Sequence, residues 1–186
     1  MEVDQWAARF ASGLSGPTGF VHQGRSATAT IGTMDLLRAM ALGIREQLRY
    51  IRRVERGVQT PAETLRRGNG TCRDFAWLMI DAVRSLGLAA RFVSGYIFVP
   101  DTAPAIDEGG ATHAWLQVYL PGAGWVDFDP TNSIIGNRNL IRVAVAWSPM
   151  QVLPLWGTYV GSVSACLGMQ VAVSVTEEPS HADTLA

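Results

Sequence analysis

The stretch GNGTCRDFAWLMIDAVRSLGL, residues 68–88, constrains the fold more than any other part of this 186-residue chain. Its glycines make a turn, and the apolar residues that follow recur at the spacing of one helical face. Thr71 and Asp74 have the spacing of a capping box, although Asn69 could provide the cap instead. With Thr71 as the cap, the stretch predicts a helix whose first residue is Cys72.

The rest of the chain alternates between helical and strand patterns. Periodic apolar residues predict helices, and segments rich in β-branched and aromatic residues predict strands. The three-residue connection PGA between two of the strands indicates a hairpin. The predicted helices cover residues 33–55, a short segment that starts at Thr60-Pro61 and ends at the glycines 68 and 70, and residues 72–86; the predicted strands cover residues 89–99, 113–120, 124–130, 140–147 and 168–176.

The length corresponds to about one domain, and we find no internal repeat. The segment before residue 33 is rich in Gly, Ser and Ala, and the last residues carry no pattern. We therefore expect a docked N-terminal arm over residues 1–32, a catalytic domain over residues 33–178 and a flexible tail over residues 179–186.

The charge pattern excludes two classes of partner. Fifteen Lys and Arg balance sixteen Asp and Glu, so no overall field attracts nucleic acid or an anionic membrane. No apolar run reaches the ~20 residues of a membrane span, and the N-terminus lacks the pattern of a signal peptide. We expect a cytoplasmic protein that binds neither nucleic acid nor membrane.

The chain has two cysteines in different contexts. Cys166 is flanked by small and apolar residues, which predicts a buried, inert thiol. Cys72 would lie at the positive end of a helix dipole, where the thiolate is favoured and the thiol pKa falls from about 8.5. The neighbouring glycines would let a substrate approach the sulfur. The structural alternative is a small residue buried at a helix start.

A reactive thiolate needs a base, and His113 is the best placed of three histidines. His22 lies in a Gly- and Ser-rich stretch and His181 in the predicted tail, whereas His113 opens a strand. Strand alternation turns its side chain away from the core. The same alternation in the next strand presents both Asp127 and Asp129, and either could orient the imidazole.

Two blocks of the sequence resemble the core of the bacterial transglutaminase-like superfamily of papain-like thiol enzymes. They are TPAETLRRGNGTCRDFAWLMIDAVRSLGLAARFVSGY and THAWLQVYLPGAGWVDFDPTN. The resemblance covers about residues 33–178. It implies an α+β papain-like fold, with the Cys72 helix packed on an antiparallel sheet. It also implies a catalytic triad of Cys72, His113 and Asp129, the aspartate of DPT, so that Asp127 becomes a neighbour.

The resemblance implies acyl transfer through a thioester, with a peptide or protein amide as substrate and no cofactor or metal. Peptidase, amidase and transglutaminase activities share this triad, so the sequence does not separate them, and it does not predict the oligomeric state. Gln59 and Tyr50 are candidates for a second oxyanion donor, although a structural role is the better interpretation of each. The chain departs from the family in Trp147-Ser148, where relatives tend to have Arg-Asp. The β-rich N-terminal domain of many relatives is not among these 186 residues, as expected of a fragment.

Two other functions are compatible with the residues. Cys72, His113 and an aspartate could hold zinc, but two distant cysteines and no close pair of ligands make this a weak candidate. The second alternative is a catalytically silent binding module that keeps the fold.

Overall fold

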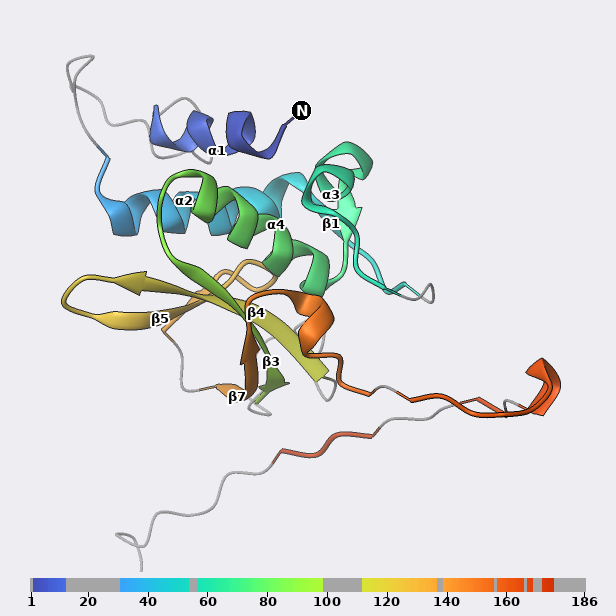
Figure 1. Cartoon of the computed structure of the whole chain (residues 1–186). Helices are drawn as coiled ribbons and strands as arrows, with labels where there is room; N and C mark the ends of the chain where they lie inside the picture. The colour runs from blue at the N-terminus through green and yellow to red at the C-terminus, as the bar shows by residue number, and fades with distance from the viewer. Residues whose placement is uncertain are drawn as a thin grey trace, which may run out of the picture.

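The computed structural model describes residues 2–12, 31–53, 57–98, 112–136, 139–155, 157–165, 167–168 and 172–175 (Figure 1). The predictions made for His22, Cys166 and His181 lie outside these residues. None of the described helices is long and apolar enough to cross a membrane.

The α-helices α1, α2, α3 and α4 gather on one side of the sheet (Figure 1). Both α3 and α4 begin with capping boxes. Helix α3 also has proline in its first turn, as its sequence predicts. The α-helices are α1 (Val3–Ala11), α2 (Thr33–Gln47), α3 (Pro61–Arg67) and α4 (Cys72–Ser85); the 3-10 helices are η1 (Pro149–Gln151) and η2 (Val163–Ala165).

The strands form an antiparallel five-stranded sheet with the order β6-β5-β4-β3-β7. A separate parallel pair, β1 with β2, lies near the start of α4. The strands are β1 (Arg49–Tyr50), β2 (Asn69–Gly70), β3 (Ala90–Ile97), β4 (Thr112–Leu120), β5 (Gly124–Asp129), β6 (Ile134–Ile135) and β7 (Leu140–Ala146).

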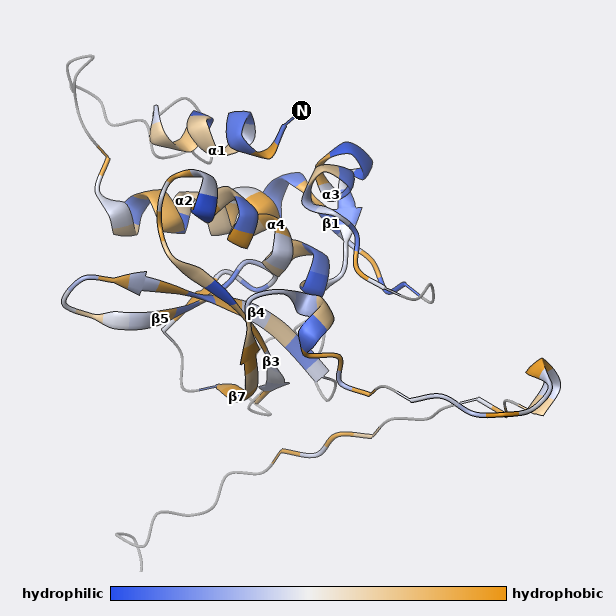
Figure 2. Ribbon diagram, viewed as in Figure 1, coloured by the Kyte–Doolittle hydropathy of each residue, from blue (hydrophilic) through white to orange (hydrophobic). Residues whose placement is uncertain are grey.

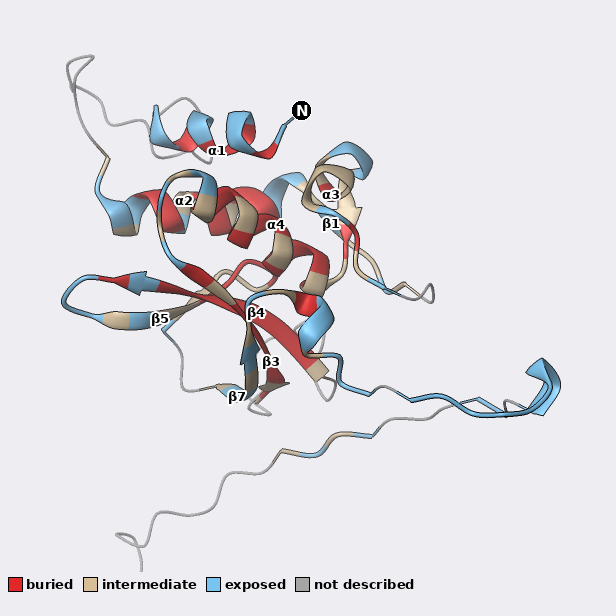
Figure 3. Cartoon of the chain, in the orientation of Figure 1, coloured by how far each residue is buried: buried red, intermediate tan, exposed pale blue. Residues whose placement is uncertain are grey.

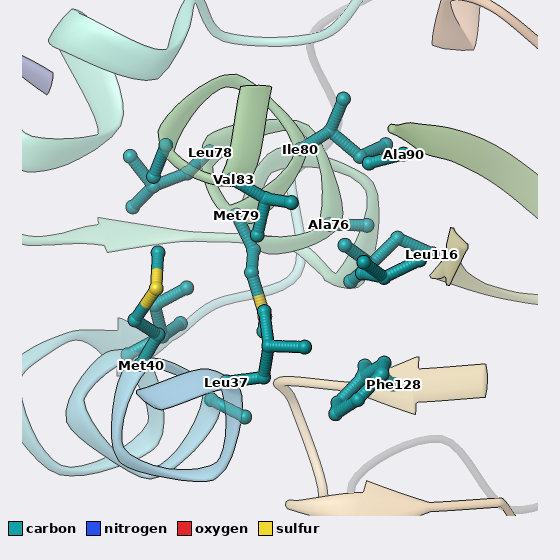
Figure 4. Close-up of a cluster of buried hydrophobic side chains, with 14 of the residues drawn as sticks. Leu37, Met40, Ala76, Leu78, Met79, Ile80, Val83, Ala90, Leu116 and Phe128 are labelled. Carbon is teal, nitrogen blue, oxygen red and sulfur yellow. The ribbon is translucent and has the colours of Figure 1, made fainter. Parts of the chain in front are cut away.

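The core fills the space between α4 and the sheet. Helix α4 packs on β4 and β3, and α1, α2 and α3 pack on α4 in turn. Figure 4 shows Met79 of α4 among Leu37 and Met40 of α2, with Leu116 and Phe128 of the sheet nearby. The apolar stripes of the helices in Figure 2 coincide with the buried surfaces in Figure 3. Burial of these side chains, each contributing about 1.5–3 kcal/mol, fixes α4 on the sheet.

The predicted α+β fold, with the Cys72 helix on an antiparallel sheet, is confirmed. Helix α4 ends at Ser85, one residue before the predicted end. Gly87 follows with a left-handed φ of 82°, and the amide of Leu88 donates to the Val83 carbonyl. The hairpin of β4 and β5 is also present. Helix α1 was not predicted from the sequence, yet Trp6 and Phe10 of α1 are buried in the core.

The predicted helix over residues 33–55 is wrong beyond Gln47. Leu48 is extended, and the chain then forms β1, whose residues Arg49 and Tyr50 pair with Asn69 and Gly70. Pairing with a distant segment overrides the helical periodicity of the local sequence. This change of course brings the chain after β1 to the start of α4.

The last predicted strand, residues 168–176, is also wrong where it can be compared. Residues 172–175 have no strand structure, and residues 169–171 and 176 lie outside the described residues. Figure 3 shows the described segments after η1 running away from the sheet with most of their residues exposed. A strand pattern without a neighbouring strand has no hydrogen-bond partners to hold it extended in a sheet.

Candidate active site

Cys72 is the first residue of α4, and the capping box fixes its position. The Thr71 hydroxyl accepts a hydrogen bond from the Asp74 amide at 3.4 Å, and the Asp74 carboxylate accepts one from the Thr71 amide at 2.9 Å. The sulfur therefore lies at the positive end of the helix dipole, as predicted. Cys72 is buried and forms no disulfide.

The Asp74 carboxylate holds three segments together at this helix start. It is fully buried, and besides the bond from Thr71 it accepts two hydrogen bonds from Gln59. The backbone amide of Gln59 donates at 2.6 Å and its side-chain amide at 3.3 Å. The Arg53 guanidinium lies 3.4 Å from its second oxygen, in an ion pair whose arginine side chain is 12% exposed. One carboxylate thus ties the residue before Cys72 to the segments at 53 and 59.

His113 and Asp129 form a second buried pair on the sheet. His113 Nε2 lies 2.8 Å from Asp129 Oδ2, and both side chains are fully buried. The other Asp129 oxygen accepts the backbone amides of Thr131 at 2.9 Å and Asn132 at 3.3 Å, and the Asn132 side chain donates to Oδ2 at 2.8 Å. The carboxylate is therefore oriented by the turn that follows β5.

The surroundings favour the charged form of Asp129. Burial raises the pKa of its carboxyl, but the charge of His113 and the hydrogen bonds from His113 and Asn132 outweigh burial. Together they hold the pKa of Asp129 below its ordinary value. A carboxylate that stays ionised can support an imidazolium at His113.

Strand register explains why Asp129, and not Asp127, lies beside His113. Gln117 on β4 is opposite Asp127 on β5. On this face of the sheet, Asp127 therefore lies diagonally across from Trp115, and Asp129 lies diagonally across from His113. The Trp115 indole donates to Asp127 at 2.7 Å, which leaves Asp129 for His113. The Trp115 and His113 rings stack with centroids 6.0 Å apart.

A single pocket brings the helix start and the sheet together. Its volume is about 210 Å³, and the described residues that line it include both Cys72 and His113. Figure 1 shows the start of α4 close above the start of β4, where these two residues lie. The arrangement unites a thiol, an imidazole and a carboxylate, the groups that nucleophilic catalysis by cysteine requires.

Comparison with known proteins identifies the family. The family model of the Transglutaminase-like superfamily matches residues 21–130, more than half of the chain. The chain belongs to the transglutaminase-like superfamily. An uncharacterized protein of Mycobacterium leprae is 32% identical to it over 137 residues, 73% of this chain and 48% of the relative. One of Mycobacterium tuberculosis is 36% identical over 119 residues, 60% of this chain and 38% of the relative.

A solved structure supports the same fold for this transglutaminase-like chain. It is that of a candidate cysteine protease of Cytophaga hutchinsonii, with a TM-score of 0.56 and 22% identity. The match covers 80% of this chain and 44% of that chain. This chain thus spans between about two fifths and one half of the length of these two relatives and of this solved structure.

Gln59 has a structural role in this transglutaminase-like domain. Its side-chain amide donates to the Asn69 carbonyl at 2.9 Å and to Asp74 at 3.3 Å, so its donors are engaged away from the pocket. Tyr50 packs edge-on against Phe75, with ring centroids 6.4 Å apart.

Among the described residues, no cluster of three or more His, Cys, Asp or Glu is arranged to hold a metal ion, so the zinc alternative gains no support.

Sequence reasoning missed the two arginines of the site. Arg53 and Arg73 both line the pocket beside Cys72. The local cluster of Arg52, Arg53, Arg56, Arg66 and Arg67 predicts solvated helix and loop faces, with a phosphate or carboxylate contact as the minor alternative. For Arg53 the structure shows a carboxylate contact, because its charge is buried against Asp74. The only signal for Arg73 was its position next to the cysteine, and no local rule links it to its partners 76 and 79 residues further along the chain.

We predict that Asp74→Ala destabilises the domain strongly, because it removes one half of the capping box of α4 and leaves Arg53 buried without its counter-ion. The expected loss is about 3–5 kcal/mol in the free energy of unfolding, measured by urea denaturation. Asp35→Ala is the matched control, since Asp35 is also the third residue of a helix but pairs with Arg38 on an exposed surface. Its cost should stay within about 1 kcal/mol. Equal costs for the two variants would contradict the role given to Asp74.

We predict that the stabilising effect of Asp129 is lost in acid. Its folded pKa lies below the unfolded value of about 3.9, so the unfolded chain takes up the proton first as the pH falls. The stability difference between wild type and Asp129→Asn should therefore be largest above about pH 4 and shrink progressively below it. Urea denaturation of both proteins over this range measures the difference, and a difference independent of pH would refute the assigned ion pair.

Proposed function

We propose that this chain is a thiol enzyme that cleaves or transfers amide bonds through a triad of Cys72, His113 and Asp129. The observation that carries the proposal is the shared pocket: a cysteine at a helix start and a histidine hydrogen-bonded to a buried carboxylate line the same cavity. Membership of the transglutaminase-like superfamily supports this chemistry. The substrate would be the amide of a peptide or protein, and no cofactor takes part.

The hydrogen bond between His113 and Asp129 sets the role of each imidazole nitrogen. Because Nε2 faces the carboxylate, Nδ1 is the nitrogen that can take the proton of the Cys72 thiol. The Asp129 charge stabilises the imidazolium that results. The helix dipole at the start of α4 stabilises the thiolate, so both halves of the ion pair are supported by their own element.

The proposed reaction has two steps. The Cys72 thiolate attacks the amide carbonyl, a C–S bond forms, and the C–N bond breaks as His113 gives its proton to the leaving amine. Water or an acceptor amine then attacks the thioester carbonyl, and His113 takes the proton of this second nucleophile. The C–S bond breaks, the acyl group leaves on the nucleophile, and the thiolate–imidazolium pair is restored. Hydrolase and transferase differ only in this second nucleophile.

The negative oxygen that develops in each step needs hydrogen-bond donors. The backbone N–H of Cys72 belongs to the first turn of α4, whose amides point toward the open N-terminal end of the helix. Placed beside the sulfur, it is the natural first donor. Gln59, whose amide is bound to Asn69 and Asp74, is not proposed as the second.

A catalytically silent binding module of the same family is the alternative, and the site does not favour it. Cys72, His113 and Asp129 are all present, and two shells of hydrogen bonds around Asp74 and Asp129 keep them in place. The expected cytoplasmic location stays a prediction, as does the absence of nucleic-acid and membrane partners.

We predict that an activated ester such as p-nitrophenyl acetate acetylates Cys72, with a burst of one nitrophenolate per chain. Intact-mass and peptide mass spectrometry locate the acetyl group, and added primary amine reveals whether the thioester passes to an amine or to water. Cys72→Ala should give no adduct, and His113→Ala should acylate about 10²–10⁴-fold more slowly. A folded wild-type protein that forms no Cys72 adduct would contradict the proposal and favour the binding module.

A further inference from the structure

The pocket beside Cys72 is positively charged at its wall. Its described lining includes two arginines and two threonines and no acidic residue. The carboxylates closest in the hydrogen-bond network, Asp74 and Asp129, are fully buried behind Thr71 and His113. The described residues that line the pocket are Arg53, Gly57, Thr71, Cys72, Arg73, Thr112 and His113.

Arg53 presents a fixed cation to this pocket. Its Nε lies 3.4 Å from Asp74, and its Nη2 donates to the Gly57 carbonyl at 2.8 Å. Within the described part of the chain, the remaining terminal nitrogen, Nη1, has no hydrogen bond. A guanidinium held on one side in this way keeps two N–H donors for a ligand on the other.

Arg73 presents a second cation, and its charge has no carboxylate in direct contact. Its Nη2 donates to the carbonyls of Pro149 at 2.8 Å and Val152 at 3.0 Å, and its guanidinium lies over the Phe92 ring at 5.0 Å. Among the described residues it forms no ion pair. Neutral carbonyls and an aromatic ring orient this charge without neutralising it.

From these two arginines we infer that the pocket binds a carboxylate of the substrate, held by the guanidiniums of Arg53 and Arg73. A partly desolvated guanidinium favours a carboxylate over a neutral group, because the carboxylate adds the attraction of an opposite charge and its two oxygens match the paired N–H donors. The inference rests on the proposed function, since it places this carboxylate next to the amide that Cys72 attacks. It names the substrate class as an amide with an acidic group close to the reacting bond.

The size of the pocket agrees with a small anionic group. Its volume of about 210 Å³ lies below the range of about 300–1,000 Å³ that is typical of sites for whole drug-sized ligands. It suits one acidic side chain or one chain-terminal carboxylate. The two sources share the same chemistry, and paired peptide substrates with an acidic side chain or with a free against an amidated C-terminus distinguish them.

The test compares two alkylating reagents that differ in charge. Iodoacetate is anionic and iodoacetamide is neutral, and with each the Cys72 sulfur displaces iodide to form a new S–C bond. The ratio of the two rates at Cys72, divided by the same ratio for glutathione, measures selection for a carboxylate. We expect the wild-type ratio to exceed that of glutathione by at least about fivefold at low salt and to fall as salt screens the charges.

Charge-removing variants assign the effect to the arginines. Arg53→Gln and Arg73→Gln should each lower the normalised ratio by at least about threefold, and the corresponding lysine variants should keep part of it, because lysine keeps the charge but not the paired N–H donors. Arg84→Gln is the control, because Arg84 also donates to two backbone carbonyls, those of Ala90 and Trp147, but does not line the pocket. Its ratio should be unchanged.

Failure of this inference differs from failure of the proposed function. Rapid labelling by iodoacetamide together with a ratio equal to that of glutathione would leave the triad intact and overturn the carboxylate site. A high ratio that both glutamine variants retain would assign the selection to the His113 imidazolium and would also overturn it. Slow labelling by both reagents would argue against an activated Cys72, while the ratio would still decide the carboxylate site.

Discussion

The buried Asp74 carboxylate is the interaction on which the geometry of the site depends. It accepts hydrogen bonds from Thr71 and Gln59 and pairs with Arg53, so that three segments of the chain meet at one group. A buried charge is tolerated only with such partners, because desolvation of an unpaired carboxylate costs several kcal/mol. The same network that satisfies Asp74 fixes the first turn of α4, and with it the position of Cys72 and of the Arg53 charge.

The second half of the site depends on the sheet. His113 and Asp129 lie on neighbouring strands whose register is fixed by the core face, where Leu116 is opposite Phe128. A slip of one residue would turn every side chain of a strand to the other face, so the packing of α4 on the sheet also fixes the histidine and its acid. The thiol and the imidazole are thus carried by two rigid elements joined through one core, which is the arrangement that precise catalysis requires.

Local sequence rules predicted the parts of the fold that local chemistry determines. The capping box of Thr71 and Asp74, the length of α4 and the hairpin of β4 and β5 each depend on a few neighbouring residues. Alternation along β5 placed Asp127 and Asp129 on one face but did not choose between them, because alternation defines faces and not register. The family resemblance selected Asp129, and the structure places that residue beside His113.

The features that the sequence did not reveal are long-range. Arg53 and Gln59 contact Asp74 across 21 and 15 residues of sequence. Arg73 contacts Pro149 of η1 across 76 residues. Helix α2 ends early because β1 pairs with β2, a contact that no helical pattern encodes. Helix α1 was missed because a short amphipathic segment beside a Gly- and Ser-rich stretch gains its stability from packing on α4.

The central claim is that Cys72 and His113 form a thiolate–imidazolium pair. Its most direct test is the rate of Cys72 alkylation by iodoacetamide from about pH 4 to about pH 9, followed by peptide mass spectrometry in wild type and His113→Ala. The account predicts rapid labelling well below the ordinary thiol pKa of about 8.5 and loss of this reactivity in the variant. Labelling that follows an ordinary thiol titration in both proteins would contradict it.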